Sequence, residues 1–355
     1  VLLLAAFGVA SLIRAGRKVE GAVIGALIAF GVLASNAFTY HDTNLAPTDR
    51  FQELIAIGDR FSGTSPTLAV DFDEYTFYAM PDMGIDGPGF ASRSETVARL
   101  RDGVLGSYGQ SFDVDALPLE AVQKYPLILV RRKPENSRPP ANFDLAFRGR
   151  FWDVWRRTRS PRVVEHLPGG GLLAAASRLR CRDVRDLARR ARADDTRLTY
   201  AVRPPLAVLE AAKAPVRPAG WALLPEGVGL YGPGELGGRV RLPVSGRYRV
   251  WLKGDFGREL SVFVGGRRIG GVSYSTGGAG NYGEPLVGEF PAGRNKVSVV
   301  RPGGSLRPGD GTPGRLVAVV FEPLDERPRM VDVPATEWRS ACDRPVDWVE
   351  RVRPG

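Results

Sequence analysis

Acidic side chains gather directly after an apolar segment in the N-terminal half of the chain. Residues 67–72, TLAVDF, predict a strand that carries Asp71 and is followed by Asp73 and Glu74. Carboxylates at the end of a strand can bind a hard divalent cation or act as acid and base. The alternative, which we favour, is that Asp73 caps the next helix and the other two carboxylates are solvated.

A second group of polar and aromatic residues lies in and around the glycine-rich segment YSTGGAGNYG. Sugar binding needs aromatic rings against C–H faces and fixed polar side chains for hydroxyl groups. Trp251 is equally suited to core or inter-domain packing, and Tyr282 to anchoring this loop. The candidates for carbohydrate contact are Trp251, Arg258, Tyr274, Asn281, Tyr282 and Asp310.

Other catalytic arrangements find no support in the residue pattern. The two histidines, His41 and His166, lie far apart in sequence and lack metal-type spacing. Neither Cys181 nor Cys342 has a histidine nearby in sequence, so a thiol nucleophile is not supported. We therefore assign no catalytic residue in this segment.

Two apolar stretches at the start of the chain predict transmembrane helices within residues 1–40. Residues 21–40 supply the roughly 20 uncharged positions that a spanning helix needs, whereas residues 1–13 are too few. We expect these helices to be the last pair of a longer transmembrane region, the first one truncated. A signal-peptide core and a buried soluble hairpin are the alternatives.

The loop between the apolar stretches sets the expected orientation. Residues 14–20 contain Arg14, Arg17 and Lys18, so the positive-inside rule places this loop in the cytoplasm. Residues 41–355 would then be extracytoplasmic, with the protein in the cell membrane. A lone cysteine pair outside the membrane usually forms a disulfide, so we expect a Cys181–Cys342 bond.

The remaining chain changes character near residue 215. Mixed helical and strand patterns in residues 41–215 predict an α/β extracytoplasmic domain. Short alternating strands with Gly and Pro turns in residues 216–325 predict a β-sandwich of the jelly-roll type. The tail, residues 326–355, contains Trp338 and Trp348 and is expected to pack back on the α/β domain.

The net charge and its distribution limit the classes of partner that we expect. The net charge is +10 and comes mostly from arginines scattered among carboxylates. No RNA- or DNA-binding motif accompanies them, so nucleic acid is not an expected partner. Membrane lipid and a cell-envelope polysaccharide remain, and the oligomeric state is open.

Two resemblances connect these parts. The segment SGRYRVWLKGDFGRELSVFVGGRRIG resembles the core of galactose-binding-like jelly rolls, a superfamily with many carbohydrate-binding modules. The order of parts, with DRFQELIAIGDRF, VDFDEY and PLILVRRKPENSRPPANFDLAFRGRFWDVWRR, resembles the C-terminal region of actinobacterial multi-pass membrane proteins. Those proteins are similar to polyprenyl-phosphate-dependent glycosyltransferases of the type-C fold, including the arabinofuranosyltransferase-like group.

The resemblance implies an accessory, acceptor-binding region of a membrane glycosyltransferase that acts on cell-envelope glycan. It implies no cofactor in this segment, whereas the parent protein would use a polyprenyl-phosphate sugar donor, with a divalent cation as an open point. The family's catalytic acids would precede residue 1, so enzymatic activity of this segment is left open. The alternatives are a non-catalytic membrane-anchored glycan-binding or scaffolding protein and an independent extracytoplasmic hydrolase.

Overall fold

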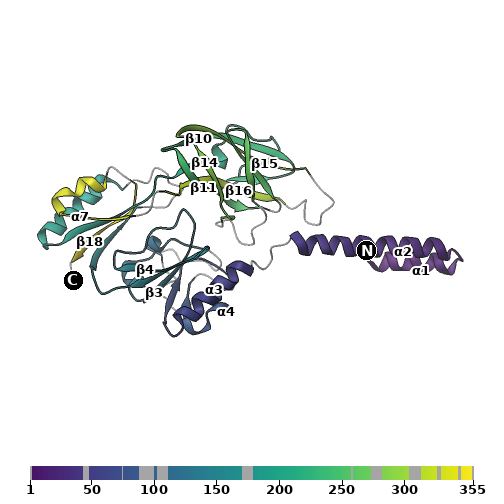
Figure 1. Cartoon of the computed structure of the whole chain (residues 1–355), viewed down its shortest axis with the longest axis horizontal. Helices are drawn as coiled ribbons and strands as arrows, with labels where there is room; N and C mark the ends of the chain where they lie inside the picture. Colours follow the sequence, from purple (N-terminus) through teal and green to yellow (C-terminus); the bar gives the residue numbers. More distant parts are fainter. Residues whose placement is uncertain are drawn as a thin grey trace.

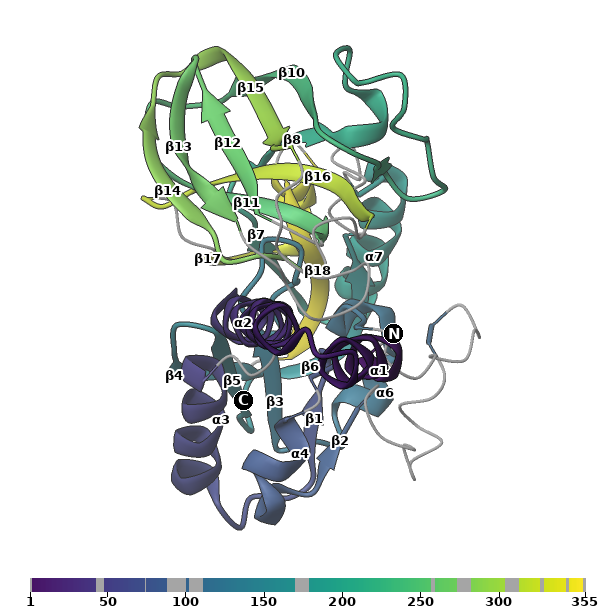
Figure 2. The same cartoon turned by 90° about the vertical axis from the view of Figure 1, so that its right-hand side faces the viewer.

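The computed structural model describes residues 2–42, 48–73, 75–87, 100–101, 111–169, 179–256, 259–272, 282–303, 313–325, 329–342 and 345–353. Within these ranges the chain forms a helical hairpin followed by three units built on β-sheets (Figure 1). The view along the hairpin shows the sandwich on one side of it and the α/β unit on the other (Figure 2).

The helical hairpin projects from the rest of the molecule (Figure 1). It consists of α1 (Leu2–Arg14) and α2 (Lys18–Asp42), and Gly16 between them has a positive φ of 82° that suits the tight reversal. Large apolar side chains such as Phe7, Leu27 and Phe30 are exposed on it. Among the described residues, one helical stretch, Lys18–Ala37 with mean hydropathy 1.7, has the length and composition to cross a membrane.

The α/β unit is a five-stranded sheet in the order β2-β1-β3-β5-β4. Side chains of the central strand β3 alternate between two cores: Leu127 and Leu129 pack on the side of α3, and Ile128 and Val130 on the opposite side. This explains why the strand is continuously apolar. The elements are α3 (Thr48–Phe61), β1 (Thr67–Ala69), α4 (Thr76–Ala79), η1 (Pro81–Met83), β2 (Ile85–Asp86), η2 (Val114–Ala116), α6 (Leu119–Val122), β3 (Leu127–Arg131), β4 (Phe143–Arg148) and β5 (Trp152–Arg157).

The second unit is an antiparallel sheet in the order β17-β7-β18-β6, which joins the middle of the chain to its tail. Val184 and Leu187 of α7 pack with Tyr200 and Val349 on one face. We refer to this unit as the C-terminal sheet. Its elements are β6 (Arg162–Pro168), α7 (Cys181–Ala193), β7 (Arg197–Val202), β17 (Arg329–Val333), η4 (Ala335–Ala341) and β18 (Val346–Arg353).

The sandwich is inserted between β7 and β17, and its two sheets run β10-β15-β12-β13 and β14-β11-β16-β8. Tyr248, Val250 and Leu252 of β11 alternate into its core, as the sequence pattern predicts. The sandwich begins earlier than residue 216, because β8 already pairs with β16. Its elements are β8 (Ala207–Glu210), η3 (Ala211–Lys213), β9 (Val228–Leu230), β10 (Gly234–Leu242), β11 (Gly246–Asp255), β12 (Leu260–Val264), β13 (Arg267–Val272), β14 (Leu286–Phe290), β15 (Gly293–Arg301) and β16 (Gly314–Pro323).

Buried polar contacts fasten the C-terminal sheet to the α/β unit. Asp347 accepts a hydrogen bond from the backbone N–H of Arg138 at 3.0 Å, and Glu350 accepts one from the N–H of Ala141 at 2.8 Å. The indole N–H of Trp348 donates to the carbonyl oxygen of Arg138 at 2.6 Å. Because each bond satisfies a group that burial would otherwise leave without water, the two units are held in one defined arrangement.

Candidate functional site

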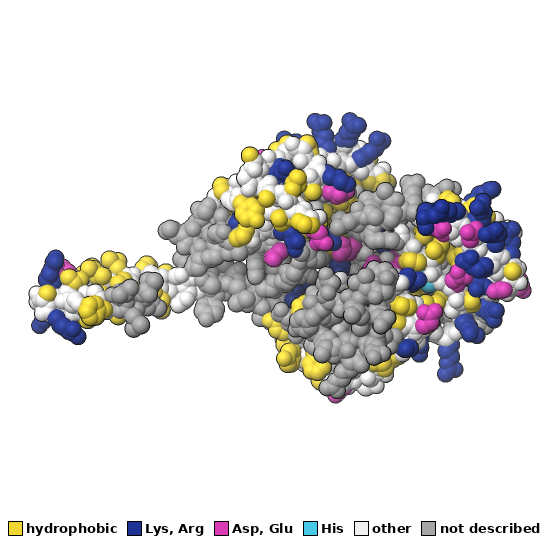
Figure 3. Space-filling model, turned by 180° about the vertical axis from the view of Figure 1, so that it is seen from behind, with side chains coloured by type: hydrophobic (Ala, Val, Ile, Leu, Met, Phe, Trp, Pro, Cys, Tyr) yellow, Lys and Arg dark blue, Asp and Glu magenta, His cyan; other side chains and the backbone are white. Residues whose placement is uncertain are grey.

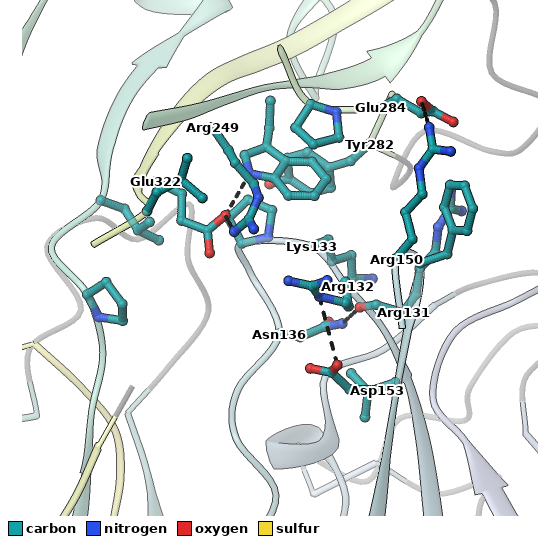
Figure 4. A pocket seen from close by; sticks show the side chains of 18 of the residues that line it. Arg131, Arg132, Lys133, Asn136, Arg150, Asp153, Arg249, Tyr282, Glu284 and Glu322 are labelled. Carbon is teal, nitrogen blue, oxygen red and sulfur yellow. Dashed lines mark hydrogen bonds and ion pairs between the residues drawn. The ribbon is translucent and has the colours of Figure 1, made fainter. Parts of the chain in front are cut away.

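A cleft of about 1180 Å³ lies where the sandwich meets the α/β unit (Figure 4). One wall comes from the end of β3, the loop that follows it, and the β4–β5 hairpin. The other wall comes from β11, from residues 282–286 and from the end of β16. The space-filling view shows charged side chains along this seam where it is not covered by residues drawn in grey (Figure 3). We call this feature the interdomain cleft.

Positive charge dominates the lining of the interdomain cleft. Nine cationic side chains face four carboxylates, a difference of five charges. Three further carboxylates, Asp49, Asp71 and Asp73, pair with Arg150, Lys133 and Arg50 of this set, which leaves an excess of two. The cations are Arg50, Arg131, Arg132, Lys133, Arg138, Arg148, Arg150, Arg203 and Arg249, and the carboxylates are Asp153, Glu284, Glu322 and Asp347.

Most of these cations already have a carboxylate partner. Arg132 and Arg148 share Asp153, with N–O distances of 3.8 and 3.4 Å. Burial raises the pKa of Asp153, and the two guanidinium groups oppose that rise. Arg249 lies 3.6 Å from Glu322, and Arg150 lies 3.0 Å from Glu284. These pairs fix the side chains around the cleft without neutralising it.

Arg131 and Arg138 have no described carboxylate within ion-pair distance of their guanidinium groups, but Arg138 donates to the carbonyl oxygens of Pro139 and Phe143 at 3.2 Å, whereas the Arg131 guanidinium has no such acceptor among the described residues. Burial lowers the pKa of Arg131, and the positive charge of Arg50 lowers it further, while the more distant Asp71, Asp73 and Glu284 act in the opposite direction. Its backbone N–H donates to Asp71 at 2.8 Å, which anchors the residue at the end of β3.

Aromatic rings add flat apolar surfaces to the same cleft. Phe151 and Trp155 of the β4–β5 hairpin are half-buried and line it. The guanidinium of Arg138 lies 4.9 Å from the ring centroid of Trp155, and that of Arg150 lies 4.9 Å from the centroid of Phe151. A guanidinium stacked on a ring is held in place there, and its N–H groups remain available as donors beside the exposed part of the ring.

The acidic group predicted after the first strand has structural partners. Asp71 pairs with Lys133, and Asp73 lies 2.9 Å from Arg50 and accepts a hydrogen bond from the N–H of Tyr75 at 3.0 Å. Glu74 lies outside the described residues. No group of three or more His, Cys, Asp or Glu side chains suited to a metal occurs among the described residues. Asp71 and Asp73 thus hold the cationic wall of the cleft in place.

Two of the predicted carbohydrate contacts, Trp251 and Tyr282, line the cleft. Both are buried, and their rings meet edge to face with centroids 6.0 Å apart. The indole N–H of Trp251 donates to Glu322 at 2.9 Å, and the hydroxyl of Tyr282 donates to Glu135 at 3.1 Å. Their polar groups are therefore already engaged. Arg258, Tyr274, Asn281 and Asp310 lie outside the described residues.

Cys181 begins α7 and Cys342 directly follows η4, and these two helices pack together. No disulfide bond joins the two cysteines in the structure. Cys181 is exposed and Cys342 is buried. The expected disulfide is therefore not confirmed, although the fold brings the two residues together across the inserted sandwich.

Sequence reasoning missed the residues that give the cleft its charge. Arg131, Arg132 and Lys133 form a basic run directly after a buried strand. Such a run usually predicts a solvated strand end, and nothing in its spacing shows that the sandwich will lie opposite. Phe151 and Trp155 belong to the antiparallel hairpin of β4 and β5, and nothing in their spacing marks them as part of a site.

Comparisons with known proteins yield structural likenesses alone. No protein-family model and no curated protein matches the chain. The CBM36-1 domain of a multidomain xylanase from the hindgut metagenome of Trinervitermes trinervoides is 13% identical, with a TM-score of 0.28; the match covers 34% of this chain and 99% of that domain.

A family 35 carbohydrate-binding module from Clostridium thermocellum is 18% identical, with a TM-score of 0.27; the match covers 32% of this chain and 97% of the module. A carbohydrate-binding module CBM36 solved with calcium and xylotriose is 13% identical, with a TM-score of 0.25. The structural neighbours are thus carbohydrate-binding modules. At these values the likeness transfers no ligand and no binding residue to this chain.

Proposed function

We propose that this chain binds a cell-envelope glycan in the interdomain cleft and serves as the extracytoplasmic, acceptor-binding region of a membrane glycosyltransferase that uses a lipid-linked sugar donor. The helices of residues 1–40 would anchor it in the cell membrane. The interdomain cleft carries the proposal, because it combines half-buried aromatic rings with fixed guanidinium donors. Aromatic faces and oriented polar groups are what a sugar chain requires.

The position of the cleft also suits a polymer. Its walls come from two differently folded units, and these are held together by the contacts of Glu135 from the loop after β3 with Lys253 and Tyr282 of the sandwich, at 2.7 and 3.1 Å. A ligand seated between two fixed walls is oriented by both of them, which reduces the entropy lost when it binds. An acceptor chain held in this way would be presented in a constant direction.

The glycan-binding part of the proposal is tested with the full chain in detergent micelles on an array of bacterial envelope polysaccharides. Replacing Trp155→Leu should weaken binding to the retained polysaccharide roughly tenfold, because an aromatic anchor is lost. Tyr231→Leu, on a half-exposed ring of the sandwich outside the cleft, is the matched control and should bind normally. Absence of binding to every polysaccharide would contradict the proposal.

The glycosyltransferase part needs a separate measurement in cells that express the protein. Cells with Trp155→Leu in the chromosomal gene should make envelope glycan with fewer substituents or shorter chains than cells with Tyr231→Leu. Glycan binding by the purified protein together with an unchanged envelope would favour a scaffolding role and reject the link to sugar transfer.

A further inference from the structure

We propose that Arg131 anchors an oxyanion subsite in the interdomain cleft, so that the glycan bound there is acidic and presents a carboxylate or a phosphate. This rests on the proposed function and adds the chemical class of the ligand. The subsite consists of Arg131 at the end of β3 with Arg150 of the β4–β5 turn, which lie on the same side of the cleft (Figure 4).

Arg131 has no carboxylate partner among the described residues. A charged group removed from water is costly unless an opposite charge or hydrogen bonds replace the solvent. Its neighbours Arg50 and Lys133 have such partners in Asp73 and Asp71, whereas Arg131 has no described carboxylate within ion-pair distance. The nearby carboxylates therefore satisfy the other cations first. An anion in the cleft would supply what Arg131 lacks.

Arg150 is held only by exposed ion pairs. Its guanidinium binds Asp49 at 3.1 Å and Glu284 at 3.0 Å, and all three side chains are mostly exposed. Exposed ion pairs contribute little free energy, so Arg150 can exchange Glu284 for a ligand at small cost. Glu284 also acts electrostatically on Arg131 from beyond ion-pair distance, so the carboxylate that Arg150 binds lies within the field of both guanidinium groups. That carboxylate marks where a ligand oxyanion would sit.

The shape of the donor group also fits an oxyanion. A guanidinium offers parallel N–H groups that match the two oxygens of a carboxylate or a phosphate, and such bidentate pairs are stronger than neutral hydrogen bonds. Phe151, on which Arg150 is stacked, supplies an apolar face next to the same point. Charge and ring side by side fit a sugar that carries an acidic group better than they fit a free inorganic ion.

The test compares each acidic probe with a neutral sugar of the same size, using the full chain in detergent micelles and isothermal titration calorimetry. A short oligogalacturonate and galactose 1-phosphate are the acidic probes, and an oligogalactan of the same length and galactose are their respective neutral counterparts. At least one acidic probe should bind about tenfold or more tightly than its neutral counterpart. Arg131→Gln should remove that advantage, and Arg239→Gln, which changes an exposed arginine of β10 by the same charge, should retain it.

The variants also separate binding from folding. Arg131→Lys keeps the charge but loses the planar pair of donors, so it should recover part of the affinity. Thermal unfolding should show Arg131→Gln to be as stable as the unchanged protein, because no ion pair is removed. An Arg131→Gln protein that folds and keeps its preference for the acidic probe would overturn the proposal.

The remaining outcomes either identify the kind of oxyanion that binds or reject the subsite. Preference for oligogalacturonate identifies a carboxylate, and preference for galactose 1-phosphate identifies a phosphate. Equal affinity for acidic and neutral probes overturns the subsite while leaving glycan binding intact. If no probe binds here and no polysaccharide binds on the array, the proposed function fails with it.

Discussion

The imidazole Nδ1 of His166 lies 2.6 Å from a carboxylate oxygen of Glu350, and its Nε2 lies 3.1 Å from Asp115. His166 and Glu350 belong to neighbouring strands of the C-terminal sheet, β6 and β18, whereas Asp115 belongs to η2 of the α/β unit. All three side chains are buried. One ring therefore connects the tail of the chain to a unit that ends about 200 residues earlier.

This contact predicts a stability that depends on pH. Burial alone would lower the pKa of His166, but Asp115 and Glu350 outweigh it and raise the pKa to about 9. The histidine pKa is about 6.5 in an unfolded chain, so protonation stabilises the fold fully below that pH. This stabilisation, roughly 3 kcal/mol at most, is lost as the pH rises from about 6.5 through 9. Urea unfolding of the full chain across this range would measure it.

The matched variant for this experiment is His166→Gln, which keeps a hydrogen-bonding side chain but cannot be protonated. The difference in unfolding free energy between the two proteins isolates the histidine from other buried groups, such as Asp113, whose pKa burial and Asp115 raise to about 7. This difference should shrink as the pH rises. A constant difference at all pH values would show that His166 is not the titrating group.

We expect the contacts of Glu135, which hold the sandwich against the α/β unit, to contribute to stability. Its carboxylate accepts from Lys253 at 2.7 Å and from the hydroxyl of Tyr282 at 3.1 Å, and Lys253 is only 9% exposed. Glu135→Ala leaves this buried ammonium without its partner, so stability should fall by roughly 2 to 4 kcal/mol. Chemical denaturation measures the loss. Glu259→Ala, which breaks an exposed pair with Arg268, should cost less than about 1 kcal/mol.

We expect Cys181 and Cys342 to form a disulfide bond in protein that folds outside a reducing compartment. Because α7 and η4 bring Cys181 and Cys342 together, oxidation requires little rearrangement of the fold. Mass spectrometry of a non-reduced digest should detect the linked peptides. The bond would close a loop of about 160 residues, which loop-entropy arguments value at a few kcal/mol. Two free thiols in secreted, folded protein would reject the prediction.

We expect replacement of Arg131 to lower glycan affinity without lowering stability. Its half-buried guanidinium has no ion-pair partner among the described residues, and Arg50 adds repulsion. Arg131→Met should therefore leave the unfolding free energy unchanged or raise it by about 1 kcal/mol, although glycan affinity falls. Denaturant titration would measure this, with Arg203→Met as the contrast, because that change leaves the buried Asp347 without its ion-pair partner. A clear loss of stability in Arg131→Met would show that the residue supports the fold instead.

Local sequence patterns identified the strands more readily than their arrangement. The alternation of Tyr248, Val250 and Leu252 placed three side chains in one core, because a strand exposes its residues to two faces in turn. Trp251 follows the same rule and points to the other face, where it meets Tyr282. Both features depend on neighbours in sequence, so they are accessible without a structure.

Local patterns of this kind could not predict the C-terminal sheet or the interdomain cleft. Strands β7 and β17 are neighbours in space, although the whole sandwich separates them in sequence. Likewise, Arg131 faces residues of β11 and β16 that follow it by more than a hundred positions. No local pattern in the sequence indicates which residues meet across such long separations. An arginine run has the same pattern whether it faces water or another unit of the fold.

The paired ends of the inserted sandwich have a mechanical consequence. The chain leaves the C-terminal sheet at Val202 and returns at Arg329, and these two residues are partners in the ladder of β7 and β17. A pull on the sandwich would reach the sheet through both strands at once and in the same direction. It would leave the ladder between β7 and β17 unsheared and would load the ladder between β7 and β18, whose bonds would have to shear together instead of opening singly. The paired attachment of the sandwich thus directs such a pull onto the β7–β18 ladder.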